Sequence, residues 1–169
     1  MGKDKTEEIK SRLEEALKNS TCLKHPVAAV IYDFSGDYVE SGWNGPLDFI
    51  KHDKCLRDGY PSGEGMELCP GSHAEIRAIS NAAKYNGGIY KGTIYLSSWL
   101  PCADCAKSIV DAEIKRLVTP NWVYSNEKER TLVPELRNQP YNFEMAEKLI
   151  VGAGIEIIVN ESIKPNPEM

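Results

Sequence analysis

Two short stretches of the sequence place one imidazole, two thiols and one carboxylate where a metal site needs them. The first is His73-Ala74-Glu75 and the second is Pro101-Cys102-Ala103-Asp104-Cys105. A catalytic zinc ion takes three protein ligands and leaves a fourth position open, and one histidine with two cysteines makes such a set. We therefore predict that His73, Cys102 and Cys105 bind zinc. A structural zinc site would prefer a fourth protein ligand, and none stands at a matching spacing.

The hydrophobic pattern around these stretches alternates between strand and helix. Apolar residues at helical spacing predict helices over 6–18, 73–85, 102–111 and 142–151. Short apolar runs rich in β-branched residues predict strands over 27–32, 38–43, 93–97, 115–119 and 155–159, with the first two forming a hairpin. We expect an α/β protein with three layers, α/β/α, around a mixed central sheet of about five strands.

Both candidate metal stretches lie where a helix is predicted to begin. In sheets of this kind ligands gather beyond the carboxyl ends of the strands, where helix N-termini also point. The helix dipole stabilises a thiolate at such a position. Glu75 lies two residues from His73, too near to join the coordination comfortably, so we expect it to handle protons beside the metal.

Three segments lack a clear period. Residues 44–72 are dense in Gly and Pro, and we interpret them as an inserted flap because such long irregular segments are generally functional. We expect residues 120–140 to be a surface excursion and residues 160–169 to be a loose tail. The chain of 169 residues has the length of one domain, so we treat 1–169 as a single zinc-dependent domain.

The composition limits which partners the protein could bind and in which cellular compartment we expect it. The net charge of −5 argues against a general binder of nucleic acid, which would show a basic face. No apolar run approaches the ~20 residues of a membrane span, and the first residues lack the apolar core of a signal peptide. The five cysteines, two of them in Cys-x-x-Cys, then favour metal binding over disulfides, and we expect a cytoplasmic protein.

The two metal stretches together form the pattern H-x-E…P-C-x-x-C, which is the signature of zinc-dependent nucleobase deaminases. The sequence resembles the cytidine deaminase superfamily, and within it most of all the deoxycytidylate (dCMP) deaminases. The resemblance is carried by 73–79, 101–107, 20–22 and 27–31, with Gly42-Trp43-Asn44-Gly45-Pro46 similar to the family's Gly-aromatic-Asn-Gly segment. It implies the cytidine deaminase-like fold and runs from about residue 10 to 119.

The resemblance also implies a reaction, the hydrolytic deamination of dCMP to dUMP and ammonia. A zinc ion in such a site lowers the pKa of its water to about 7. Glu75 is then expected to take a proton from the water that attacks C4 of cytosine. It delivers a proton to N3 and later to the departing amine.

Five residues are predicted to contact the substrate. By resemblance, Asn44 contacts the sugar, while Ser98 and Trp99 line the base pocket. Arg57 and Arg77 are candidates for the phosphate, because arginine binds phosphate bidentately. Arg77 stands where many relatives carry Asn, so the alternative is that it lies on the solvated side of its helix. The alternative for Asn44, which directly precedes Gly45, is simple turn chemistry.

The resemblance extends to a second metal and to partners. Cys55 and Cys69 lie in the expected flap, with His52 three residues before Cys55, and some dCMP deaminases bind a second zinc in this region; the alternative is that both are buried thiols. Similar proteins are often homo-oligomers, and some are regulated by dCTP and dTTP.

Two rival functions stay open at this point. One is the same chemistry on another substrate, such as cytidine, deoxycytidine, guanine or another nucleobase. The other is a noncatalytic, zinc-stabilised binding or regulatory module. A nucleic-acid substrate is disfavoured by the acidic charge balance.

Overall fold

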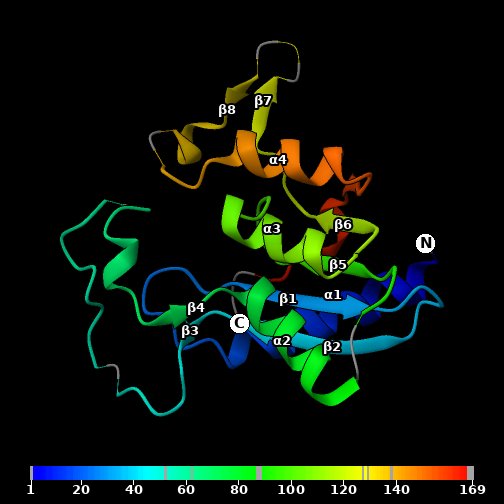
Figure 1. The fold of residues 1–169 in the computed structure, drawn as a ribbon, viewed down its shortest axis with the longest axis horizontal. Helices are drawn as coiled ribbons and strands as arrows, with labels where there is room; N and C mark the ends of the chain where they lie inside the picture. Colours follow the sequence, from blue (N-terminus) through cyan, green and yellow to red (C-terminus); the bar gives the residue numbers. More distant parts are fainter. Residues whose placement is uncertain are drawn as a thin grey trace.

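The architecture is a five-stranded mixed sheet with helices on both faces (Figure 1). The computed structural model describes residues 2–51, 53–61, 63–86, 89–126, 128, 130–137 and 139–166. In spatial order the strands are β2 (Tyr38–Trp43), β1 (Ala28–Tyr32), β5 (Thr93–Leu96), β6 (Arg116–Thr119) and β9 (Glu156–Val159). β1 pairs antiparallel with β2 and β5, whereas β6 pairs parallel with β5 and β9. The predicted fold class is confirmed.

Strand β1 lies at the centre of the packing because all of its residues are buried. Side chains alternate between the two faces of a strand. Ala29 and Ile31 therefore join one apolar cluster, while Val30 and Tyr32 join another on the opposite face. The unbroken apolar run that predicts this strand reflects burial on both faces.

The helices divide between these two faces. Helix α1 (Lys3–Lys18) packs Ile9 and Leu13 against the face that carries Val30 and Tyr32. The other face is covered by α2 (Ala74–Asn86), α3 (Ala103–Asp111) and α4 (Phe143–Gly152). Together the helices and the sheet make the three layers that the sequence predicts.

Helix α2 lies unusually close to strand β2. The residues of α2 that face the sheet are small alanines, among them Ala74 and Ala78. A Cβ on Gly42 of β2 would stand 2.2 Å from the backbone nitrogen of Ala78 and 2.3 Å from the carbonyl oxygen of Ala74. The two backbones are therefore in direct contact, which fixes the start of α2 against the sheet.

The segment 44–72 leaves the sheet and returns to it at nearly the same place (Figure 1). Its first residues form β3 (Gly45–Pro46), which pairs antiparallel with β4 (Gly71–Ser72) near its end. The 3-10 helix η1 (Met66–Leu68) lies between them. Because β4 directly precedes His73, this pairing ties the expected flap to the start of α2.

The expectation of a simple surface excursion over 120–140 is wrong for part of that segment. Strands β7 (Tyr124–Asn126) and β8 (Thr131–Leu132) form a short hairpin, followed by the 3-10 helix η2 (Pro134–Leu136). Val123, Tyr124 and Leu136 are buried against the cluster under α2, α3 and α4. These apolar residues are isolated among polar ones and prolines, so they produce no period that a sequence pattern reveals.

The expectation of a loose tail is also corrected for residues 160–166. The 3-10 helix η3 (Glu161–Ile163) places Ile163 fully buried in the apolar cluster under α1. The backbone nitrogen of Asn166 then donates to the Glu14 side chain on α1 at 3.2 Å. Residues 167–169 lie outside the described residues. Within the described ranges, no helix is both long and apolar enough to cross a membrane.

Candidate metal centre and its cavity

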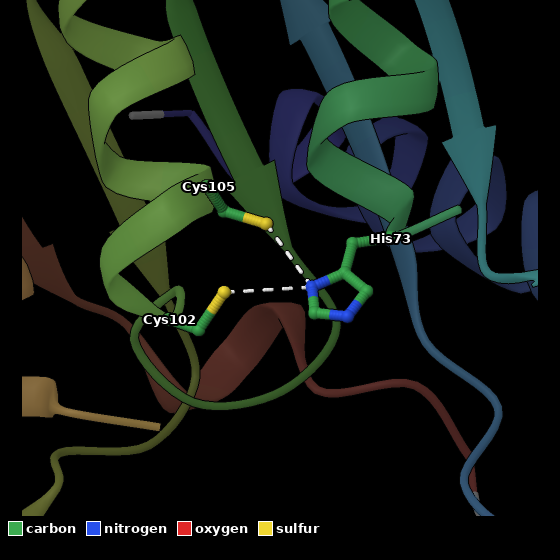
Figure 2. Close-up of side chains that lie close together, drawn as sticks. All are labelled: His73, Cys102 and Cys105. Atoms are coloured by element: carbon green, nitrogen blue, oxygen red, sulfur yellow. Dashed lines mark hydrogen bonds between the residues drawn. The ribbon is translucent and has the colours of Figure 1, made fainter. Parts of the chain in front are cut away.

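The three predicted metal ligands meet at the adjoining starts of two helices (Figure 2). His73 directly precedes the first residue of α2. Cys102 is the N-cap residue of α3, and Cys105 lies in the first turn of that helix. Both helix starts follow strands, so the fold places the ligands where the sequence pattern expects them.

The spacing of the donor atoms fits a tetrahedral zinc ion. Nδ1 of His73 lies 3.2 Å from Sγ of Cys105 and 3.5 Å from Sγ of Cys102. A tetrahedral ion with Zn–N and Zn–S bonds of about 2.1 and 2.3 Å separates a nitrogen from a sulfur ligand by about 3.6 Å. The three donor atoms all lie within 4.8 Å of one another. The residues present therefore suit zinc in both type and distance.

The electrostatics of the cluster favour one thiolate, at Cys102. Hydrogen bonding from Cys105, supported by His73, lowers the pKa of the Cys102 thiol to about 4. The pKa of Cys105 is raised, because its proton is held in the hydrogen bond to Cys102 and because the thiol is buried. The bond to Cys102 also raises the pKa of His73. A metal ion binds such a cluster by displacing these remaining protons.

Glu75 lies in the first turn of α2, beside the cluster. Its side chain is only 7% exposed, and it lines the same cavity as His73 and Cys102. Burial raises the pKa of the Glu75 carboxyl group, because the charged form loses its hydration. A carboxylate with a raised pKa accepts a proton more readily, which is the property that general acid–base work near neutral pH needs.

A cavity of about 560 Å³ opens onto the cluster. This size lies within the range of ~300–1,000 Å³ that is usual for small-molecule sites. Four predicted substrate contacts line it, namely Asn44, Arg57, Ser98 and Trp99. The fold thus brings together residues that are far apart in the sequence.

Asn44 lines this cavity and also holds the neighbouring backbone in place. Its Oδ1 accepts from the backbone nitrogen of Val27 and from Oγ of Ser20, both at 2.8 Å. Its Nδ2 donates to the carbonyl oxygen of His25 at 2.7 Å. The side chain therefore organises the loop before β1, beyond ordinary turn chemistry.

Arg57 brings a cationic side chain to the cavity, and Lys24 joins it there. Arg57 is 9% exposed, and its Nε donates to the carbonyl oxygen of Glu64 at 2.8 Å. Nζ of Lys24 donates to the carbonyl oxygen of Arg57 at 2.6 Å and lies 3.9 Å from the Asp58 carboxylate. Sequence reasoning missed Lys24, because a single lysine in a loop carries no signal until the fold places it.

Arg77 does not line the cavity. Its Nη2 donates to the carbonyl oxygens of Gly45 at 2.9 Å and Pro46 at 3.0 Å, so the guanidinium is engaged by the backbone of β3. The structure therefore does not support the prediction that Arg77 contacts the substrate phosphate, and shows a contact within the protein in its place. Arg77 is half-buried, so its side chain is partly exposed on its helix while its guanidinium binds the backbone of β3.

Cys55 and Cys69 both line the cavity, and both are half-buried free thiols. Across the described residues, the cluster of His73, Cys102 and Cys105 is the single group of histidine, cysteine and acidic side chains that is arranged to hold a metal ion. His52, the third residue of the predicted second zinc site, lies outside the described residues. The geometry thus gives no support to a second zinc.

Comparison with known proteins agrees with this site. The family profile "Cytidine and deoxycytidylate deaminase zinc-binding region" matches residues 3–120. A tRNA-specific adenosine deaminase from Haemophilus influenzae is 33% identical over 108 residues, which are 63% of this chain and 51% of the relative. A deoxycytidylate deaminase from Enterobacteria phage T4 is 29% identical over 103 residues, 61% of this chain and 50% of the relative. The chain thus matches about half the length of these curated relatives.

Solved structures show the same fold. The dCMP deaminase from the cyanophage S-TIM5, determined in complex with dCMP and dUMP, superposes with a TM-score of 0.66 and 23% sequence identity. The match covers 95% of this chain and 99% of the phage protein. With the family profile spanning both metal stretches and a His/Cys/Cys cluster of suitable geometry, the chain belongs to the cytidine and deoxycytidylate deaminase family of zinc-binding enzymes.

Proposed function

We propose that this protein hydrolyses the exocyclic amine of dCMP to give dUMP and ammonia. The observation that carries the proposal is the content of one cavity. The zinc-type cluster and the buried carboxylate of Glu75 share it with two cationic side chains, Lys24 and Arg57. The first pair of features suits hydrolytic deamination, and the cations suit a substrate that carries a phosphate.

The chemistry divides between the metal and the chain. Zinc held by His73, Cys102 and Cys105 would supply a water whose pKa lies near neutrality. Glu75 accepts a proton from the water that attacks C4 of the base and passes a proton to N3. The C–O bond has formed at this stage, and Glu75 next carries the remaining proton of that oxygen to the amine. The C–N bond then breaks, ammonia leaves, and the C4 oxygen becomes the carbonyl of dUMP.

Other cavity residues orient the substrate in this proposal. Trp99 offers an aromatic face for the base, and Ser98 lies beside it on the same wall. Asn44, which also lines the cavity, is assigned to the sugar. Lys24 and Arg57 are assigned to the phosphate, with Arg57 held in place by its bond to Glu64.

The Haemophilus relative suggests a second candidate, the deamination of adenosine in tRNA. That substrate is a polyanion, and proteins that bind it usually neutralise several phosphates with a basic surface. This chain carries 25 acidic and 20 basic residues, a net charge of −5. We therefore place a nucleotide monophosphate ahead of tRNA.

We also propose the domain organisation and the partners of the protein. We treat 1–169 as one domain in which the flap 44–72 covers the cavity. Association into a homo-oligomer and regulation by dCTP and dTTP follow from the family resemblance alone.

The test is ammonia release by the zinc-loaded protein with dCMP, deoxycytidine, cytidine, guanine and a tRNA anticodon stem-loop offered in parallel. We expect the highest kcat/KM on dCMP. A preference for deoxycytidine or guanine would keep the chemistry and refute the phosphate assignment, whereas turnover of the stem-loop alone would favour the second candidate. No turnover of any substrate with one zinc bound per chain would favour a noncatalytic module.

A further inference from the structure

Arg77 connects helix α2 to the cavity wall without entering the cavity. It lies one helical turn beyond His73, and its Nη2 binds the carbonyl oxygens of Gly45 and Pro46. The guanidinium carbon lies 5.4 Å from the centre of the Trp43 ring. Arg77 therefore holds the chain on both sides of Asn44, from the same helix that carries Glu75.

A second set of hydrogen bonds continues from Asn44 to the loop before β1. The Asn44 side chain binds Val27, Ser20 and His25, and the backbone nitrogen of Asn44 donates to the carbonyl oxygen of Val27 at 3.0 Å. Residues 22–27 of this loop line the cavity. The position of the loop thus depends on where Asn44 is held.

A third set continues from the loop to the flap. Nζ of Lys24 binds the carbonyl oxygen of Arg57, and Nε of Arg57 binds that of Glu64. These hydrogen bonds therefore form one series from α2 through β3 and the loop to the flap. We call this series, from Arg77 through Asn44 and Lys24 to Arg57, the wall network.

The segment that Arg77 holds has little freedom to settle elsewhere. Gly45 has φ +140°, and a Cβ there would stand 2.2 Å from Oγ1 of Thr21. On the other side, Pro46 pairs with Gly71 of β4. If Gly45 and Pro46 shift when the bonds to Arg77 are lost, Thr21 and Gly71 must shift with them, because close-packed segments transmit displacement to each other.

We propose that Arg77 is a positioning residue that sets the shape of the substrate-binding wall through β3 and Asn44, and that it makes no contact with the substrate. This inference rests on the proposed function in one respect, that the cavity binds the nucleotide. It assigns part of the substrate affinity of that site to a residue outside it.

The geometry explains why arginine suits this position. A planar guanidinium can stack near an aromatic ring while its N–H groups, fixed in one plane, reach two carbonyl oxygens. A lysine keeps the charge but presents a compact ammonium without that planar fork. Methionine keeps much of the length and apolar stem and removes all the donors.

The test compares Arg77→Met and Arg77→Lys with Lys84→Met. Lys84 is an exposed cation on the same helix, and it does not line the cavity, so the control loses the same charge. With dCMP and deoxycytidine as substrates, we expect Arg77→Met to raise KM for both by about tenfold. This factor corresponds to the free energy of roughly one charge-assisted hydrogen bond, here a bond within the wall that holds it in its binding shape. We expect kcat and zinc content to stay near wild type, a smaller rise in Arg77→Lys, and no change in Lys84→Met.

Amide hydrogen exchange provides a readout that needs no substrate. The backbone nitrogens of Val27 and Asn44 both donate within the wall network. We expect both to exchange faster in Arg77→Met than in wild type, while amides of the central strand β5 stay unchanged. If Arg77→Met does not fold, the exchange of Arg77→Lys at Val27 and Asn44 decides the question in the same way.

Two results would overturn the inference. A rise in KM for dCMP without one for deoxycytidine would mean that Arg77 binds the phosphate itself. Wild-type KM together with wild-type exchange at Val27 and Asn44 would mean that Arg77 positions nothing. If the wild-type protein deaminates another base in place of dCMP, the proposed function fails, but the exchange measurement still tests Arg77.

Discussion

Gly42→Ala should damage both stability and activity, although it adds only one methyl group. The new Cβ would stand 2.2 Å from the backbone nitrogen of Ala78 and 2.3 Å from the carbonyl oxygen of Ala74. Neither atom belongs to a flexible side chain. Restoring ordinary van der Waals separation of about 3.5 Å requires α2 to move by about 1 Å relative to β2.

The displacement falls on the part of α2 that carries the chemistry, because Ala74 stands between His73 and Glu75. Overpacking typically costs about 1–3 kcal/mol of unfolding free energy, and the upper end applies here because both clashing atoms belong to the backbone. A misplacement of about 1 Å can lower the rate by about 100-fold. We therefore expect Gly42→Ala to lose about 3 kcal/mol in urea denaturation and about 100-fold in kcat/KM.

A glycine in open space supplies the matched control. Gly152 is the last residue of α4, is exposed, and would place a Cβ with nothing within 4 Å. Gly152→Ala should leave activity unchanged and alter stability by no more than a gain of about 1 kcal/mol. Gly42→Ala with wild-type stability and wild-type kcat/KM would refute the claim that backbone contact between β2 and α2 sets the position of Glu75.

Three further predictions concern the tail, the metal and the phosphate. Ile163→Ala should cost about 2–5 kcal/mol of unfolding free energy, because Ile163 is fully buried; a change under about 0.5 kcal/mol would mean that the tail is not docked in solution. Cys105→Ser should abolish zinc binding measured by elemental analysis, whereas Cys55→Ser and Cys69→Ser should keep one zinc per chain; a wild type with two zinc ions would contradict this. Arg57→Met should raise KM for dCMP by about tenfold more than KM for deoxycytidine, because only dCMP carries the phosphate; an equal rise for both substrates would remove Arg57 from the phosphate site.

The sequence predicts those parts of the structure that depend on local pattern. The five sheet strands and four helices all lie within a few residues of their predicted bounds, because apolar periodicity and Gly or Pro boundaries are local features. The metal cluster is also predictable from local pattern. Each ligand stands at a helix start, and a helix start has a recognisable sequence context.

Contacts between distant segments are the part that the sequence does not reveal. Arg77 offers the same side chain to a phosphate, to solvent or to a backbone carbonyl, and only the fold brings Gly45 and Pro46 within its reach. The sequence does not predict that Lys24 lines the cavity, for the same reason. Ile163 is a single apolar residue among prolines and polar residues. The sequence therefore shows no hydrophobic periodicity there that would predict its burial against α1.

The most direct test of the central claim is the turnover of dCMP by wild type and Glu75→Gln, each assayed with its zinc content measured in the same sample. The substitution keeps the size of the side chain and removes its ability to carry a proton. The account predicts one zinc per chain in both proteins, steady release of ammonia and dUMP by wild type, and a loss of at least about 100-fold in Glu75→Gln. Equal turnover by the two zinc-loaded proteins would contradict the assignment of Glu75 as the group that moves the protons.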